Sequence, residues 1–121
     1  MNLRNILAGL VALVSALLAT AQTTRAADPD AGKAKFQKSI CVQCHGLEAQ
    51  GMAGMGMDLR TAPLIKAGSA SAIENFIRTG HRSTDKYPGG MPPNGGISLT
   101  DTDRANIAAW LLTLAKPSSH P

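Results

Sequence analysis

The sequence predicts an all-α fold of three to four short helices. No stretch of the 121 residues alternates apolar and polar side chains in the way that is typical of strands. Glycine- and proline-rich stretches separate several candidate helices. One apolar stripe with the spacing of a single helix face lies near the C-terminus, at Ile107, Trp110, Leu111 and Leu114.

Residues 1–21 are expected to be a secretory signal peptide. Arg4 supplies a positive charge, and an apolar run from Ile6 to Ala19 follows it. This run is shorter than the roughly 20 apolar residues that a membrane-spanning helix needs. Ala19-Thr20-Ala21 fits the cleavage rule, and Thr24-Arg25-Ala26 is a second candidate. An uncleaved anchor is the alternative.

Cleavage, at residue 21 or as late as 26–27, would leave a small exported protein. Removal of 21 of the 121 residues leaves 100, enough for one domain, expected over 28–116 with a tail over 117–121. We expect it in an oxidising compartment, the periplasm, with no stable membrane insertion after cleavage.

The charge balance does not indicate a nucleic-acid partner. Lys plus Arg falls from 12 to 11 when Arg4 is removed and Asp plus Glu stays at 8, which leaves a net charge of +3. Lys33, Lys35 and Lys38 form either a basic rim for an acidic partner or a solvated helix face.

The first helix is expected to begin at Asp28-Pro29 and to run to about Ile40. Aspartate caps free amides, and proline suits the first helical position. Gly32, Phe36 and Ile40 share one face. Gly32 is either the point where another helix approaches closely or a tolerated glycine near the helix start.

The only two cysteines stand in Cys41-Val42-Gln43-Cys44-His45. This spacing indicates attachment of a c-type haem. On one helical turn both thiols can reach the two vinyl groups of a porphyrin and form thioethers, and His45 can coordinate the iron. A redox-active dithiol or part of a zinc site are the alternatives, but His81 and His120 are too far apart to complete a usual zinc pair.

The stretch from Gly46 to Gly68 shows no clear periodicity and is expected to be loop. Its Gly/Met segment, residues 51–57, holds three methionines whose soft thioethers could bind copper(I), or one could bind the haem iron. Ala62-Pro63-Leu64 is expected to form a rigid turn.

A helix of about two turns is expected from Ser71 to Gly80. Ser71 and Glu74 fit a capping box, and Gly80 is a suitable end. Ile73, Phe76 and Ile77 form its apolar stripe. His81, which follows directly, is either an exposed helix-terminal histidine or a distal iron ligand.

Met91 lies in a proline- and glycine-rich segment, residues 88–96, that is neither helix nor strand. Prolines restrict the backbone directly after it. A stiff loop that carries one soft sulfur suits a distal iron ligand, so we expect Met91 to bind the iron opposite His45; a plain packing role is the alternative.

The last helix is expected to start at Thr100, with Asp101 and Asp103 at its positive end. Lys116 suits its negative end, and Pro117 stops it. His120, in the tail, is expected to have no role.

The order of these elements resembles the class I mono-haem cytochromes c of bacterial periplasms. Cys41-x-x-Cys44-His45 and Met91-Pro92 are the specific motifs, and the resemblance covers about residues 28–116. It implies that the first and last helices cross, with Gly32 and Phe36 near Trp110. It also implies that a backbone carbonyl near Pro63 accepts a hydrogen bond from His45.

The resemblance implies one covalently attached haem c and a carrier of single electrons rather than an enzyme. With His45 and Met91 both on the iron, no position stays open for a substrate. The expected partners are redox proteins: a donor dehydrogenase, and an acceptor oxidase or another cytochrome. The protein itself is expected to be a monomer or part of a small complex. The alternatives are a haem c subunit of a periplasmic oxidoreductase, such as a dehydrogenase, and an open-site gas sensor or peroxidase.

Overall fold

The computed structural model describes residues 25–115, which form five α-helices and one short 3₁₀ turn without a strand. The expected signal peptide (1–21), the tail and Lys116 lie outside the described residues. The all-α class is confirmed. The helices number one more than expected, because Pro63–Lys66 forms a single helical turn, α4, rather than a plain turn. Pro63 suits its first position.

Helix α2 (Pro29–Gln37) begins as predicted but ends three residues early. The Asp28 carboxylate accepts hydrogen bonds from the amides of Asp30 and Ala31. At the other end, the amide and the hydroxyl of Ser39 both donate to the Phe36 carbonyl, at 3.2 and 3.0 Å. A side chain that satisfies a terminal carbonyl in this way competes with continuation of the helix. Ile40 therefore lies outside α2 and is 42% exposed.

Helix α6 (Asp101–Leu114) packs against α2, and the two approach closely at Gly32. A Cβ on Gly32 would lie 1.9 Å from the backbone oxygen of Asn106, so only glycine fits there. The rings of Phe36 and Trp110 lie 4.8 Å apart. Of the two alternatives for Gly32, the close approach of another helix is the correct one, and the expected contact of Phe36 with the Trp110 region is confirmed.

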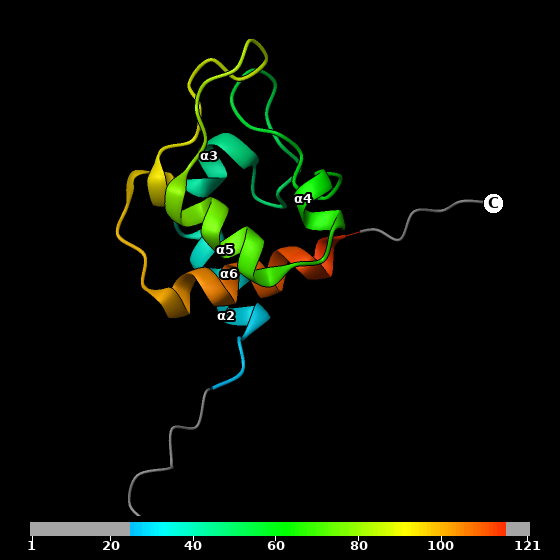
Figure 1. Cartoon of the computed structure of the whole chain (residues 1–121), viewed down its shortest axis with the longest axis vertical. Helices are drawn as coiled ribbons and strands as arrows, with labels where there is room; N and C mark the ends of the chain where they lie inside the picture. The colour runs from blue at the N-terminus through cyan, green and yellow to red at the C-terminus, as the bar shows by residue number, and fades with distance from the viewer. Residues whose placement is uncertain (1–24, 116–121) are drawn as a thin grey trace, which may run out of the picture.

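Helix α5 (Ala70–Thr79) contacts the same helix α6, which Figure 1 draws between α2 and α5. The capping box expected at Ser71 is wrong, because Ser69 is the capping residue and its hydroxyl accepts from the Ala72 amide at 3.3 Å. Gly80 ends the helix with a φ of 70°, as predicted. Helix α6 begins after Thr100, as expected, and Thr100 and Asp103 form a capping box there that was not predicted from the sequence.

The hydrophobic core lies where these helices meet, and it includes Phe36, Ile65, Ile73, Ile77, Ile107, Trp110 and Leu111. Two loops, residues 46–58 and 82–91, project side by side at the end away from α2 (Figure 1). Among residues 25–115, no helix combines the length and the apolar character needed to cross a membrane.

Candidate functional site

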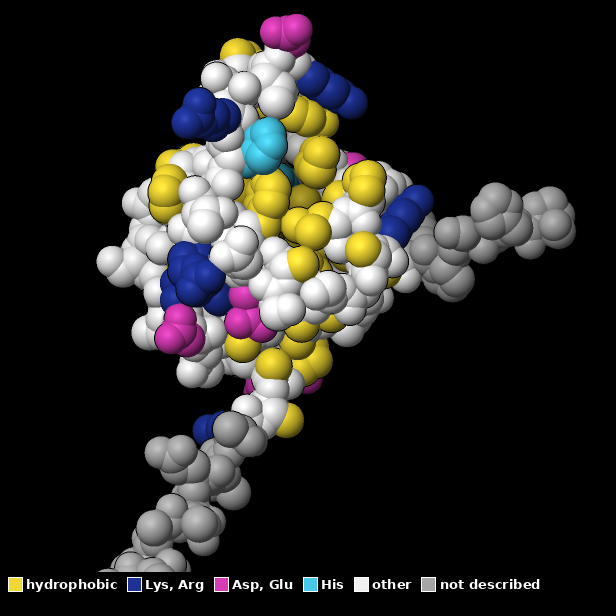
Figure 2. All heavy atoms as spheres, viewed as in Figure 1, with side chains coloured by type: hydrophobic (Ala, Val, Ile, Leu, Met, Phe, Trp, Pro, Cys, Tyr) yellow, Lys and Arg dark blue, Asp and Glu magenta, His cyan; other side chains and the backbone are white. Residues whose placement is uncertain are grey.

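A cavity of about 670 Å³ opens between the helices and the two projecting loops. Figure 2 shows hydrophobic side chains gathered around a hollow on this face, with histidine at its edge. The walls are mostly apolar and include Ile40, Leu59, Leu64, Phe76, Leu99 and Leu111. A site of this size and character suits a large, flat, apolar molecule.

The short helix α3 (Cys41–His45) forms one wall of the cavity. Cys41, Cys44 and His45 all line it, and all three are half-buried. Neither cysteine is in a disulfide. The i, i+3, i+4 spacing thus brings the two thiols and the imidazole to one surface, as the helical turn requires.

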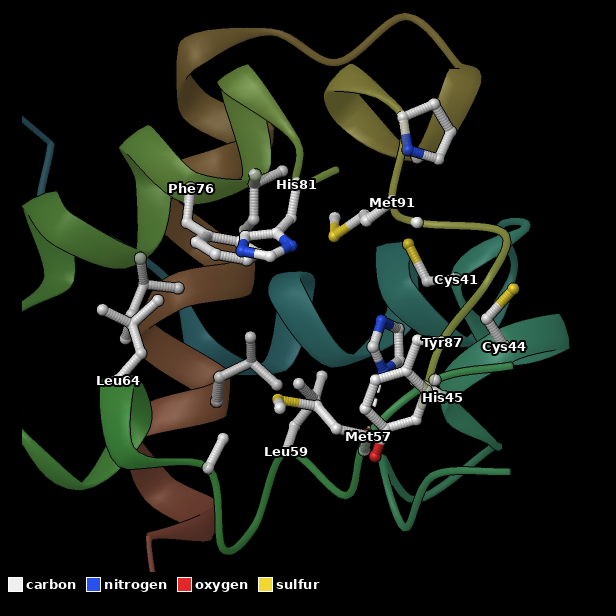
Figure 3. A pocket seen from close by; sticks show the side chains of 18 of the residues that line it. Cys41, Cys44, His45, Met57, Leu59, Leu64, Phe76, His81, Tyr87 and Met91 are labelled. Carbon is white, nitrogen blue, oxygen red and sulfur yellow. Dashed lines mark hydrogen bonds between the residues drawn. The ribbon is translucent and has the colours of Figure 1, made fainter. Parts of the chain in front are cut away.

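The ring of His45 is oriented by the Gly/Met segment. Its Nδ1 lies 3.0 Å from the backbone oxygen of Met57. A carbonyl only accepts hydrogen bonds, so Nδ1 carries a proton, and in the neutral imidazole Nε2 then has the lone pair that a metal binds. The prediction that a carbonyl near Pro63 accepts this hydrogen bond is therefore wrong. The accepting carbonyl belongs to Met57, where the chain passes beside the imidazole (Figure 3).

A tight turn delivers the Met57 carbonyl to this position. The amide of Met52 donates to the Gly56 carbonyl at 2.9 Å, and the Gly56 amide donates back to Met52 at 3.1 Å. Gly56 packs behind the ring, since a Cβ there would lie 2.5 Å from the Cys44 oxygen and 3.0 Å from His45 Nδ1. Sequence reasoning left the role of this segment open, and its closely spaced glycines were the signal of such an approach.

The methionines of the Gly/Met segment do not all face the cavity. Met55 and Met57 line it, whereas Met52 lines a separate, shallow pocket beside Lys86 and Tyr87. Within residues 25–115, no group of three or more His, Cys, Asp or Glu side chains is placed to hold a metal ion. The zinc alternative for the two cysteines therefore gains no support from their surroundings.

Met91 and His81 project from another wall. They form an isolated antiparallel bridge, in which the His81 amide donates to the Met91 carbonyl at 2.7 Å and the Met91 amide donates back at 2.8 Å. Both side chains line the cavity (Figure 3). The structure thus brings all four residues singled out from the sequence, Cys41, Cys44, His45 and Met91, to one cavity, and His81 with them.

Two glycines permit the bridge. A Cβ on Gly80 would lie 2.3 Å from the Met91 oxygen, and one on Gly90 would lie 2.8 Å from the His81 oxygen. Both have a positive φ, of 70° and 62°. The chain can therefore bring residues 81 and 91 together only because these neighbours have no side chain.

Arg104, on α6, anchors the loop that follows Met91. The residue is 9% exposed, and its side chain donates from Nη1 to Asn94 Oδ1 at 3.0 Å and to the Leu99 carbonyl at 2.8 Å. Nη2 pairs with the Asp101 carboxylate. Asn94 has a φ of 55°, which this contact helps to hold. Sequence reasoning missed Arg104, because an Asp–Arg pair three residues apart is typical of an exposed helix surface.

The charges near the first helix are largely paired within the chain. Lys33 lies 3.8 Å from Glu48, and Lys35 lies 3.3 Å from Asp103. The hydrogen bond from the Thr100 amide, with smaller contributions from the Thr100 hydroxyl and Lys35, lowers the pKa of Asp103. These pairs favour the solvated helix face over a basic rim reserved for a partner.

The residues around the cavity fit a haem c. The apolar walls suit a porphyrin, two free thiols stand on one helical turn, and an imidazole with an unprotonated Nε2 stands beside them. Met91 adds a soft sulfur from another wall. A nitrogen and a thioether are a common ligand pair for haem iron in electron-transfer proteins.

A family model described as Cytochrome C oxidase, cbb3-type, subunit III matches residues 27–111. The matched range contains the cysteine motif, the His81–Met91 bridge and most of α6. No curated protein and no solved structure matches the chain.

Proposed function

Because the chain belongs to the family of the cbb3-type cytochrome c oxidase subunit III, a family of c-type cytochrome domains, we propose that it carries single electrons in the periplasm through one haem c. Family membership makes it a haem-based electron carrier that acts with redox partner proteins. The compartment, the His45 and Met91 ligand pair and the role as a free carrier, rather than as a subunit of an enzyme, are our proposals.

The residues divide the work of holding the cofactor. Cys41 and Cys44 would attach it, each adding its S–H across a vinyl group to form a thioether. His45 and Met91 would bind the iron through nitrogen and sulfur. When bound, the haem supplies an iron that accepts and releases one electron at a time. The Met57 carbonyl keeps the His45 ring in one orientation. The apolar side chains that line the cavity exclude water from the bound haem.

The observation that supports this proposal best is the convergence of Cys41, Cys44, His45 and Met91 on one apolar cavity. Met91 lies nearly fifty residues along the chain from the cysteine motif. The His81–Met91 bridge, which the flanking Gly80 and Gly90 permit, brings the Met91 side chain to the same cavity.

Export is supported by the residues themselves. The segment 1–21 has the charge, the short apolar run and the small residues of a signal peptide.

The test is a spectrum of protein isolated from the periplasm. We expect haem to stay with the polypeptide after acid–acetone extraction, an iron–sulfur charge-transfer band in the ferric state, and no carbon monoxide binding in the ferrous state. Extractable haem would contradict the covalent attachment. Ready binding of carbon monoxide would instead favour an open site, as in a gas sensor or a peroxidase. An intact Met1 in the mass spectrum would contradict cleavage.

The family description favours a second candidate, a haem subunit of a larger oxidoreductase, because it names a subunit of an oxidase. A dehydrogenase complex would use such a subunit in the same way, as an electron acceptor. Gel filtration at high salt separates the two roles: a free carrier elutes as a monomer, and a subunit elutes with its enzyme.

A further inference from the structure

His81 stands beside Met91 on the wall that carries the proposed sulfur ligand. The two residues exchange both backbone hydrogen bonds, at 2.7 and 2.8 Å. Directly paired residues of an antiparallel bridge direct their side chains to the same face, with Cβ atoms about 5 Å apart. Both side chains accordingly line the cavity, as Figure 3 shows.

The imidazole of His81 is prepared for metal binding in the same way as that of His45. Its Nδ1 lies 2.8 Å from the carbonyl oxygen of Arg82, and the Nδ1 of His45 lies 3.0 Å from that of Met57. Since a carbonyl only accepts, each Nδ1 carries the proton and each Nε2 keeps its lone pair. The chain thus presents two imidazoles with the same free nitrogen to one cavity.

A stacking contact with Phe76 holds the His81 ring in place. The ring lies on Phe76 of α5, with centroids 5.5 Å apart and an angle of 17° between the planes. Phe76 also lines the cavity. This contact competes with metal binding by His81.

We propose that His81 is a reserve distal ligand, which binds the iron when the Met91 thioether is not on it. The bridge keeps the two side chains at the same level of the cavity, so exchange needs only that the imidazole leave Phe76 while the backbone stays in place. The iron would then keep two ligands and stay closed to small molecules. This inference rests on the proposed function, in which Met91 is the resident ligand.

The experiment compares the wild type with Met91→Ala, His81→Ala and the double variant, as covalently loaded holoproteins. Met91→Ala should lose the iron–sulfur band but stay low-spin by electron paramagnetic resonance. The double variant should be high-spin. Its apparent affinity for carbon monoxide should exceed that of Met91→Ala by about tenfold or more. This is the difference expected if His81 occupies the iron in roughly nine-tenths of the Met91→Ala molecules. His81→Ala alone should match the wild type.

Matched controls separate ligation from damage to the fold. Met91→Ala combined with His120→Ala removes a histidine from the tail instead and should behave as Met91→Ala. Added imidazole should return the double variant to low spin if its cavity is intact. Met91→Leu, which conserves side-chain volume, replaces Met91→Ala if the latter does not accumulate.

Two results would overturn the inference, and they differ in what they say of the proposed function. If Met91→Ala is high-spin and binds carbon monoxide as well as the double variant does, His81 is no reserve ligand, while Met91 stands as the resident one. If the wild type lacks the iron–sulfur band and His81→Ala alone turns it high-spin, His81 is the resident ligand, and the His45–Met91 pair fails as well.

Discussion

The two walls that carry the proposed ligands are built differently. On the proximal wall, Cys41, Cys44 and His45 lie within five consecutive residues and come together because α3 is a helical turn. On the distal wall, Met91 reaches the cavity through a bridge to His81, ten residues away. A buried arginine from α6 holds the loop that follows.

The difference shows which interactions each wall depends on. The proximal wall depends on local backbone geometry and on the packing of the Gly/Met segment, in which Met57 contacts the His45 ring and Gly56 lies behind it. The distal wall depends on glycines that allow close approach and on the buried side chain of Arg104. Distal ligation should therefore be lost first when tertiary packing is weakened.

The largest effect should come from the covalent part of the proximal wall. Replacement of both Cys41 and Cys44 by alanine removes both thioethers, and we expect no haem to stay with the polypeptide after acid–acetone extraction. Gln43→Ala, an exposed position between them, is the control and should load normally. Covalent haem in the double alanine variant would refute the attachment site.

Gly32→Ala should weaken both walls together, because α2 and α6 support both. A Cβ at this position would lie 1.9 Å from the Asn106 oxygen, so the helices must separate. We expect a loss of about 3 kcal/mol or more in the free energy of unfolding, measured by urea titration of the holoprotein. Gly89→Ala is the control, because the same Cβ there meets nothing within 4 Å. Equal stability of the two variants would argue against the close crossing.

Gly56→Ala should act on the proximal wall alone. Its Cβ would lie 2.5 Å from the Cys44 oxygen and 3.0 Å from His45 Nδ1, which displaces the turn that orients the imidazole. We expect a loss of about 2 kcal/mol in stability. The resonance of the Nδ1 proton should also shift or broaden in a proton NMR spectrum. An unchanged resonance would show that the Met57 contact does not orient His45.

Arg104→Met should act on the distal wall alone. It leaves Asn94 and the Leu99 carbonyl without their donor, at a cost of about 1 to 2 kcal/mol. We expect the iron–sulfur band to disappear at lower urea concentration than in the wild type, while the haem stays attached. Arg60→Met, which removes a partly exposed pair with Asp58, is the matched control and should leave the band unaffected.

The smallest effect should come from Asp103, at the start of α6, away from both walls. Its pKa is lowered in the folded protein, so its charge stabilises the fold above the ordinary carboxylate pKa of about 4, and this contribution is lost as the pH falls through the lowered value. Asp103→Asn should cost under about 1 kcal/mol at neutral pH, since water screens the group. In thermal unfolding the variant and the wild type should converge at acid pH; a constant difference would contradict this origin.

Local interactions made part of the molecule predictable from sequence. Caps act within one turn, so Asp28 and Thr100 marked two helix starts. The spacing of the cysteine motif is a property of a single helical turn, and the motif did form one. Local signals were misleading where two of them competed. Ser71 suited the cap of α5 as well as Ser69 does. The hydroxyl of Ser39 binds the Phe36 carbonyl and ends α2 before its apolar pattern ends.

The sequence by itself determined the all-α class and most helix starts, and it offered Gly32 as a candidate for a close approach and the residues expected to bear the ligand chemistry. Only the tertiary structure decided which carbonyl orients His45, that His81 stands beside Met91, and that Arg104 is buried beneath the distal loop. The reason is physical: caps and helical spacing depend on neighbours within a turn. These three contacts join segments ten or more residues apart, and the packing of the whole chain selects them.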